Sequence, residues 1–262
     1  MNLFRMISCV FLLALAACAP LQPSGSTTGE EKTANIQARW NAFLSLHGRQ
    51  GPSLSEGSLR FGESGNTHRV TWLLWGNDAE QLRFDIQAGI GNTLAKARLA
   101  EGVLLLYLPG DNSMLRGDDT PDGILRRIGL DLPLSLHELY AVIQGDFSSA
   151  FSHTRILSSR TLEDDGIELE LGALSPHMPA ATLTLDRRNL PVRLRIPHMW
   201  DIRIDCGDDL LPRRMDGMKR NNTNGEEYRF ILLIKDRQGR KQLADKELEL
   251  QMPADVRLLS DI

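Results

Sequence analysis

The most regular segment of the chain reads Gln81-Leu82-Arg83-Phe84-Asp85-Ile86-Gln87. Apolar and polar side chains alternate strictly in it, so that Leu82, Phe84 and Ile86 share one face and the charges and amides share the other. Side chains of a strand point alternately to its two faces, and this pattern is typical of an antiparallel strand with one face buried. The segment therefore predicts a half-buried β-strand.

Similar segments lie on both sides of it, separated by turn residues. The expected strands are 57–61, 69–75, 81–87, 94–99, 103–108, 153–160, 167–171, 181–186, 191–196, 201–205, 213–219, 228–235 and 247–251. Short strands that recur about every ten residues predict a single curved antiparallel sheet or barrel.

A helix is expected before the strands. Ile36, Trp40, Phe43 and Leu44 recur at helical spacing along one face, which predicts a helix over 34–46. We expect it to pack on the concave side of the sheet.

Two further helices interrupt the strands between 122 and 144. The first covers 122–128, after Pro121. The second begins after Ser135, with Glu138 at the third helical position, and ends at Gly145. Ser135 and Glu138 form a capping box, in which each side chain bonds the other residue's backbone N–H. We expect these helices on the concave side as well.

The N-terminus has the features of an export signal. A short basic start, Met1–Arg5, precedes an uncharged run that is too short to span a bilayer, which needs about 20 apolar residues. Leu15-Ala16-Ala17-Cys18 then resembles the lipobox of bacterial lipoproteins. The resemblance implies that 1–17 is a signal peptide and that Cys18 receives lipid. The alternative is an ordinary secretory signal that contains a cysteine.

The residues after Cys18 refine this picture. Ala19 is not the aspartate that tends to hold lipoproteins in the inner membrane of enteric bacteria, so the resemblance implies the outer membrane, with the protein facing the periplasm. Pro, Gly, Ser and Thr are frequent up to Thr33, which indicates that 18–33 is a flexible tether. We expect one folded domain over 34–262.

Composition excludes some classes of protein. The 30 Lys and Arg against 34 Asp and Glu give a net charge of −4 with no basic block, which argues against nucleic acid as a partner. Of the three cysteines, Cys9 lies in the signal and Cys18 is expected to carry lipid, so Cys206 has no intrachain partner. A disulfide framework is therefore not expected.

Motifs of catalysis and metal binding are missing or incomplete. The six histidines form no HExxH pair, and a calcium-loop start at Asp118 has Gly129 where the bidentate Glu is required. Gly89-Ile90-Gly91 lacks the third glycine of a dinucleotide fingerprint, since Leu94 stands there. We therefore expect no catalytic residue, no metal and no cofactor, and the protein is not expected to be an enzyme.

Large apolar residues on the expected strands and helices are the remaining candidates for a site. They are Trp72, Trp75, Phe84, Leu104, Leu106, Tyr107 and Phe147. In a closed barrel they would fill the core, whereas in a sheet that curls around helices without closing they could line an apolar cavity for lipid. Both interpretations stay open at this point.

Two blocks resemble a known family. The segment Leu82–Thr93, a strand, a Gly-Ile-Gly turn and the start of a strand, is similar to the corresponding region of the outer-membrane lipoprotein receptor family LolB. The segment Ile128–Gly145, with a Gly, a Leu-Pro and a helix that ends in Gly, resembles another part of that family. The end, Leu248–Val256, is closer to the terminal strand of the periplasmic carriers of the LolA family, which belongs to the same superfamily.

The resemblance implies a fold and a site. The fold is mainly β with a helical lid (α+β), an unclosed antiparallel β-barrel of about eleven strands with helices on its concave side. The implied ligands are membrane lipid and the acyl chains of lipoproteins, received from a LolA-like periplasmic carrier by a monomeric protein. The implied ligand-binding residues are Trp72, Trp75, Phe84, Leu104, Leu106 and Tyr140. Ile90, between two glycines at the tip of a turn, is implied to touch the membrane; the alternative is a turn residue folded back onto the core.

Two other functions stay open. A structural or assembly lipoprotein of the same fold would bind a protein partner, and a hydrolase would need a site dispersed along the chain. The C-terminal half is several strands longer than is typical of the LolB family, which weighs against the receptor function.

Overall fold

The structure is a computed structural model of the chain. It describes residues 29–46, 48, 51–63, 65–89, 91–121, 123–151, 154–175, 178–220 and 227–259. The chain divides after Ala38 into a short N-terminal unit and a large unit that begins at Arg39. Every strand of the described residues belongs to the large unit.

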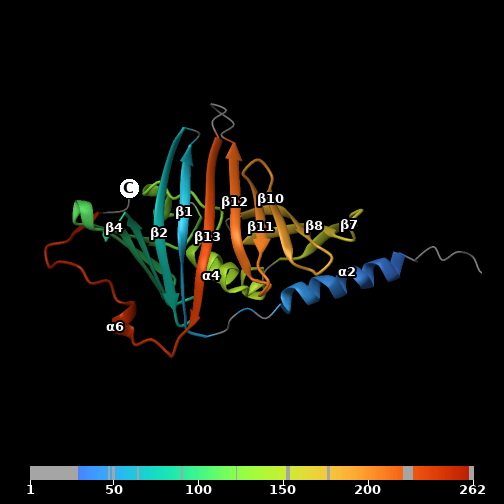
Figure 1. Cartoon of the computed structure of the whole chain (residues 1–262), viewed down its shortest axis with the longest axis horizontal. Coiled ribbons are helices and arrows are strands. Elements are labelled where there is room, and N and C mark those ends of the chain that lie inside the picture. Colours follow the sequence, from blue (N-terminus) through green and yellow to red (C-terminus); the bar gives the residue numbers. More distant parts are fainter. Residues whose placement is uncertain are drawn as a thin grey trace, which may run out of the picture. The chain divides into compact units, whose positions relative to one another are not determined.

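Fourteen strands of the described chain form one sheet (Figure 1). The first group is β1 (Ser53–Glu63), β2 (Asn66–Gly76), β3 (Leu82–Ala88), β4 (Asn92–Ala100), β5 (Val103–Leu108) and β6 (Ser113–Asp118). The second is β7 (Ile156–Thr161), β8 (Ile167–Ser175), β9 (Met178–Leu185), β10 (Pro191–Ile196), β11 (Trp200–Cys206), β12 (Pro212–Arg220), β13 (Glu227–Gly239) and the short β14 (Arg257–Leu259).

Two meanders are joined side by side in this sheet. The strand order is β14-β6-β5-β4-β3-β2-β1-β13-β12-β11-β10-β9-β8-β7, and the only parallel pair among the described strands is β14 with β6. The seam is the antiparallel pair β1 and β13, where Leu59 lies opposite Leu232. Because β7 and β14 lie at opposite ends of this order, the sheet is unclosed, as the sequence predicts.

The helices of the described residues mostly interrupt or flank the strands. They are α2 (Gly29–Leu44), a 3-10 turn η1 (Pro109–Asp111), α3 (Ile124–Arg127), α4 (Leu136–Gln144), α5 (Phe147–Ala150) and α6 (Asp245–Leu248). The segment with α3, α4 and α5 connects the two meanders. Side chains of α4 bond the inward-facing serines of β1, so this helix covers the inner face of the sheet.

The core follows the register of the strands. Leu74, Phe84, Ala97 and Leu106 lie opposite one another on β2, β3, β4 and β5, and all are buried. The alternation predicted for 81–87 is therefore confirmed on its apolar face.

The other face of β3 is covered rather than open to water. Arg83 and Asp85 are 5% and 9% exposed and form an ion pair at 2.7 Å. The C-terminal segment runs over them, since Arg83 donates a hydrogen bond to the carbonyl of Glu249 and the Trp75 indole N–H donates one to the carbonyl of Glu247. Only Leu248 of α6 is buried there.

Two expectations about elements are corrected. The strand predicted over 247–251 is wrong, because the chain forms α6 and then an extended segment without sheet partners. Two short elements were not predicted. Gly117 interrupts the apolar pattern of β6, and α5 is only a single helical turn. The helix expected over 34–46 ends at Leu44 and begins earlier, at Gly29.

Candidate functional site: an apolar cavity under the helical lid

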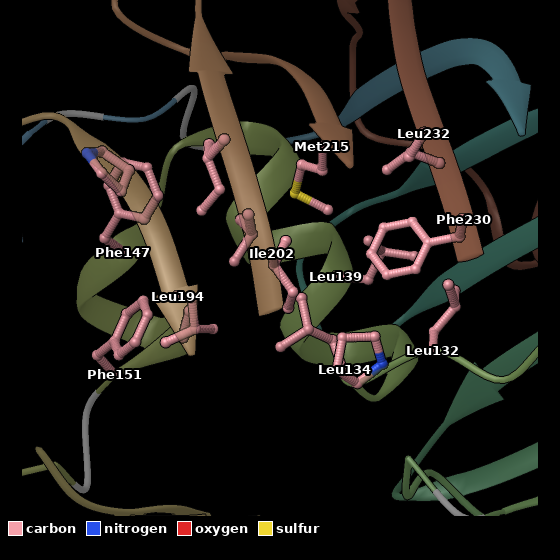
Figure 2. A pocket seen from close by; sticks show the side chains of 15 residues that line it. Leu132, Leu134, Leu139, Phe147, Phe151, Leu194, Ile202, Met215, Phe230 and Leu232 are labelled. Atoms are coloured by element: carbon pink, nitrogen blue, oxygen red, sulfur yellow. The ribbon is translucent and has the colours of Figure 1, made fainter. Parts of the chain in front are cut away.

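An apolar cavity of about 30 Å³ lies between the helical segment and the inner face of the second meander (Figure 2). The helical side contributes Leu132, Pro133, Leu134, Leu139, Val142, Phe147, Ala150 and Phe151, and the strands β10 to β13 contribute Pro191, Leu194, Ile202, Ile204, Met215, Phe230 and Leu232. Every one of these side chains is apolar. This volume has room for only a few water molecules.

Capping interactions fix the N-terminal end of α4. The Ser135 hydroxyl accepts a bond from the backbone N–H of Glu138 (3.2 Å), and the Glu138 carboxylate accepts one from the N–H of Ser135 (2.9 Å). The predicted capping box is therefore confirmed. The Asp119 carboxylate accepts two more bonds, from the N–H groups of Leu136 (2.7 Å) and His137 (2.8 Å). Its negative charge also suits the positive end of the helix.

Burial affects both carboxylates at this helix end. Desolvation raises the pKa of Asp119, although the hydrogen bonds from His137 and Leu136 act in the opposite direction. Desolvation likewise raises the pKa of Glu138, against the bonds with Ser135.

Polar contacts hold the rest of α4 against the strands. The hydroxyls of Tyr140 and Ser53 are hydrogen-bonded at 2.8 Å, and the Gln144 amide donates to the Ser55 hydroxyl at 2.8 Å. At the C-terminal end the Arg237 guanidinium donates to the carbonyl of Ile143 at 2.8 Å. The helix ends at Gly145, whose φ of +75° is the left-handed conformation that glycine adopts without strain.

Aromatic rings hold α5 in place. Phe147 stacks on Phe43 of α2 with ring centroids 4.8 Å apart, and Phe151 meets Phe43 edge to face at 5.5 Å. Trp40 lies next to both Phe43 and Phe151. Arg39 donates hydrogen bonds to the carbonyls of Asp165 (2.8 Å) and Asp186 (2.6 Å) in the turns between strands. The cavity is therefore closed firmly on this side.

Of the large apolar candidates that the sequence suggested, Phe147 lines this cavity, whereas none of the six residues that the family resemblance implied for ligand binding does. Trp72, Phe84, Leu104 and Leu106 are buried on strands of the first meander. Tyr140 is buried on α4 and uses its hydroxyl for the bond to Ser53. Whether lipid reaches any of these residues stays a prediction.

The expectation that Trp75 faces the interior is corrected. Trp72 and Trp75 are three positions apart on β2, and an odd offset puts them on opposite faces. Trp75 lies on the outer face, where the Arg83 guanidinium sits 5.4 Å from its ring.

Sequence reasoning missed the strand side of the cavity. Ile202 and Ile204 on β11, and Phe230 and Leu232 on β13, alternate with polar or outward residues. This alternation is the sequence pattern that could have identified these residues. It predicts which side chains face inward, but it does not show which part of the inner face the helices cover.

Two predicted functional residues, Cys18 and Ile90, lie outside the described residues. The glycines beside Ile90 do adopt the expected left-handed conformation, with φ of +61° at Gly89 and +79° at Gly91.

In the part of the chain that the structure describes, no cluster of three or more His, Cys, Asp or Glu side chains could hold a metal ion. The Cys206 thiol is free, and burial raises its pKa to about 11, which keeps it protonated at neutral pH. No described helix is long and apolar enough to cross a membrane.

Comparison with known proteins shows the fold. No protein-family model and no curated protein matches the chain. A LolA superfamily protein from Nitrosomonas europaea has a similar structure, with a TM-score of 0.58 and 14% identity, over 82% of this chain and 97% of that one. A DUF1329 family protein from Desulfovibrio piger gives a TM-score of 0.55 and 12% identity, over 82% and 97%.

A third similar structure is a domain from Vibrio parahaemolyticus that is named for outer-membrane lipoprotein sorting. Its TM-score is 0.52 and its identity 11%, over 81% of this chain and 94% of that one. The chain therefore has the LolA-like fold of one large, unclosed sheet with a few helices.

Proposed function

We propose that this protein binds the acyl chains of lipids or lipoproteins in the cavity under α4 and α5. Anchored to the outer membrane through Cys18 and facing the periplasm, it helps to insert lipoproteins into that membrane. The observation that carries the proposal is a lining made only of apolar side chains, between an unclosed sheet and a helical cover. The fold shared with a LolA superfamily protein and with a lipoprotein-sorting domain supports it.

Binding requires the cover to move. The cavity of about 30 Å³ is far below the roughly 300–1,000 Å³ of pockets that hold organic ligands. Each buried CH₂ group of an acyl chain contributes about 0.8 kcal/mol, so a chain of about sixteen carbons supplies on the order of 10 kcal/mol to offset the opening. The cover is held by hydrogen bonds, each with a net value of about 1 kcal/mol, and by buried apolar side chains such as Leu139 and Phe147.

Transfer by such a protein needs no catalytic group. Acyl chains pass from a weaker to a tighter site, and each 1.4 kcal/mol of difference shifts the equilibrium about tenfold. In this proposal a LolA-like carrier delivers the lipoprotein, the present protein receives it as a monomer, and the bilayer is the final acceptor.

Native mass spectrometry of the full chain isolated from membranes tests acyl-chain binding. Ala150 lines the cavity from the edge of α5, so Ala150→Trp fills the space and is expected to lower acyl occupancy by about tenfold, the effect of roughly 1.4 kcal/mol. Ser148→Trp is the matched control, because Ser148 is exposed on the same helix. If the purified wild-type chain carries no acyl adduct beyond that on Cys18, the proposal is wrong.

One observation favours a second function, the binding of a protein partner by an assembly lipoprotein. Among the described strands, β7 pairs only with β8, and its Leu157 is 49% exposed. An unpaired edge can accept a strand from another chain. A photo-crosslinking amino acid at Leu157 tests this function: a discrete protein adduct in cells supports it, and the absence of any adduct argues against it.

A further inference from the structure

A second hollow lies at the end of the sheet where three hairpins turn. It has a volume of about 570 Å³ and is bounded by the hairpin ends of β1, β2, β3, β4 and β13 and by the residues after α3. Its lining is Phe61, Gly62, Glu63, Asn66, His68, Arg69, Val70, Ala88, Leu94, Ile128, Gly129 and Tyr228. We call this hollow the cleft. Its volume is within the range of ligand pockets, about 300–1,000 Å³.

The walls of the cleft are partly apolar. Phe61, Val70 and Tyr228 occupy inward positions on β1, β2 and β13, and Leu94 is 41% exposed at the start of β4. An exposed leucine next to a cleft leaves apolar surface in water that a ligand could cover. His68 lies opposite Phe61, and the polar residues Glu63 and Asn66 lie nearer the turn between β1 and β2, where the head of an amphipathic ligand would remain in water.

One short segment separates the cleft from the apolar cavity. We call residues Ile128–Leu134 the partition. Ile128 and Gly129 line the cleft, whereas the other end of the partition, Leu132–Leu134, lines the cavity. The two hollows also share β13: Tyr228 lines the cleft, and Phe230, the next inward residue, lines the cavity. The inner face of β13 therefore runs from one hollow into the other.

Polar contacts fasten the partition to β12 and β13. The Tyr228 hydroxyl donates a hydrogen bond to the carbonyl of Gly129 (2.7 Å) and accepts one from the N–H of Asp131 (3.2 Å). The Asp131 carboxylate forms ion pairs with Lys219 (3.0 Å) and Arg126 (3.7 Å). Burial raises the pKa of Tyr228 to about 12, so its hydroxyl remains a donor at neutral pH.

The other walls of the cavity are harder to open. On the strand side, passage would break the continuous backbone pairing from β10 to β13. On the side of α5, passage would separate the rings of Phe43, Phe147 and Phe151. It would also break the hydrogen bonds that Arg39 donates to the turns between strands. Displacing the partition breaks no strand pairing. It costs the side-chain contacts of Tyr228 and Asp131, the backbone hydrogen bonds from Gly129 and Leu130 to the carbonyls of α3, and the burial of its leucines.

We propose that the cleft is the entrance through which a single fatty-acyl chain reaches the cavity, with the partition as its gate. The chain first lies against Phe61, Val70 and Leu94 with its polar head at the hairpin end. It then displaces the partition and slides along the inner face of β13 into the cavity. This inference rests on the proposed function and adds the route.

Removing the Tyr228 hydroxyl tests the gate without any ligand. Tyr228→Phe keeps the ring and deletes both hydrogen bonds, so hydrogen exchange at the amides of the partition is expected to become about fivefold faster. Tyr107→Phe is the matched control, since the Tyr107 hydroxyl bonds Asn112 elsewhere in the protein. Exchange that is unchanged in the partition of Tyr228→Phe overturns the gate.

A photoactivatable palmitate analogue tests the route. Cells that express the full chain are fed the analogue and irradiated, and crosslinked peptides of the purified protein are identified by mass spectrometry. We expect adducts both in peptides of the cleft, around Phe61 and Leu94, and in peptides of the cavity, around Leu194 and Ile202. Ile128→Glu places a charge in the cleft and is expected to lower the cavity adducts severalfold, whereas Val192→Glu, on the exposed side of β10, leaves them unchanged.

The outcomes separate the inference from the function on which it rests. Cavity adducts without cleft adducts, or cavity adducts that Ile128→Glu does not lower, refute the entrance and leave the proposed function standing. The absence of adducts from both hollows refutes both.

Discussion

At the scale of the residue, close approach of side chains and backbone decides what the inner face can accommodate. Gly217 on β12 lies opposite Phe230 on β13, and the Phe230 ring occupies the space above the glycine. A Cβ atom built on Gly217 would lie 2.0 Å from Cε1 of that ring. The glycine is therefore what allows the Phe230 ring to lie flat beside the cavity.

We predict that Gly217→Ala destabilises the protein by about 1–3 kcal/mol, the usual cost of overpacking, because the new methyl group forces the Phe230 ring out of its present position. Gly239→Ala is the matched control, since a Cβ there meets nothing within 4 Å. Denaturant unfolding monitored by circular dichroism measures both variants. Equal stability of the two would contradict the close packing of Phe230 on Gly217.

At the scale of the element, α4 depends on the buried carboxylates at its start. Asp119 and Glu138 have raised pKa values because burial penalises their charged forms. The folded protein therefore holds protons more strongly there than the unfolded chain does. As pH falls from 7 towards the unfolded value of 3.8 for Asp119, this contribution increases the free energy of unfolding, and it is lost again as pH rises through the folded pKa.

Asp119→Asn is predicted to reduce the gain in stability as pH falls from 7 towards 3.8, because the substituted side chain has no proton to bind. For one group the slope cannot exceed about 1.4 kcal/mol per pH unit. Urea unfolding at a series of pH values in this range measures it. Asp201→Asn is the control. The hydrogen bond from Arg193 lowers the pKa of Asp201, so this group changes the pH dependence of stability at pH values below its unfolded pKa of 3.8. An identical pH dependence in wild type and Asp119→Asn would rule out this role.

Sequence patterns predict these elements unequally. The capping box predicted the start of α4 and Gly145 its end, and the apolar run of β5 gave the bounds of that strand, because local chemistry determines them. The strand expected over 247–251 shows the limit: Leu248 and Leu250 alternate as in a strand, yet Leu248 is buried by a turn of helix on the outer face. The site was harder to predict than the elements. Both meanders have apolar inner faces, and the position of the helical segment decides which of them forms the cavity. That position depends on contacts between residues far apart in the sequence.

At the scale of the whole molecule, the proposed anchor, Cys18, and the apolar cavity belong to separate parts of the chain. The proposed function needs Cys18 to hold the protein at a membrane, because several buried acyl chains bind a bilayer firmly whereas one gives only marginal binding. The cavity itself lies wholly within the unit that begins at Arg39.

Cys18→Ser is predicted to give either a soluble protein or an uncleaved precursor, since the thiol is the expected acceptor of lipid. Labelling with radioactive palmitate, followed by fractionation of the cells, measures this. Cys206→Ser is the control, because its buried thiol should take no lipid. Wild-type protein without label would refute the anchor and, with it, the membrane location.

The seam between β1 and β13 also determines the order in which the chain can fold. Ribosomes make the N-terminus first, so β1 leaves the ribosome long before the strand that pairs with its second edge. Until then the first meander presents an open edge, next to apolar side chains such as Leu59, to any other chain in the compartment. Contacts between residues so distant in sequence form slowly. The nascent protein therefore passes through a period in which aggregation competes with folding. A chaperone that covers β1 during synthesis or export is expected to raise the yield of folded protein more than a chaperone that acts after β13 has paired.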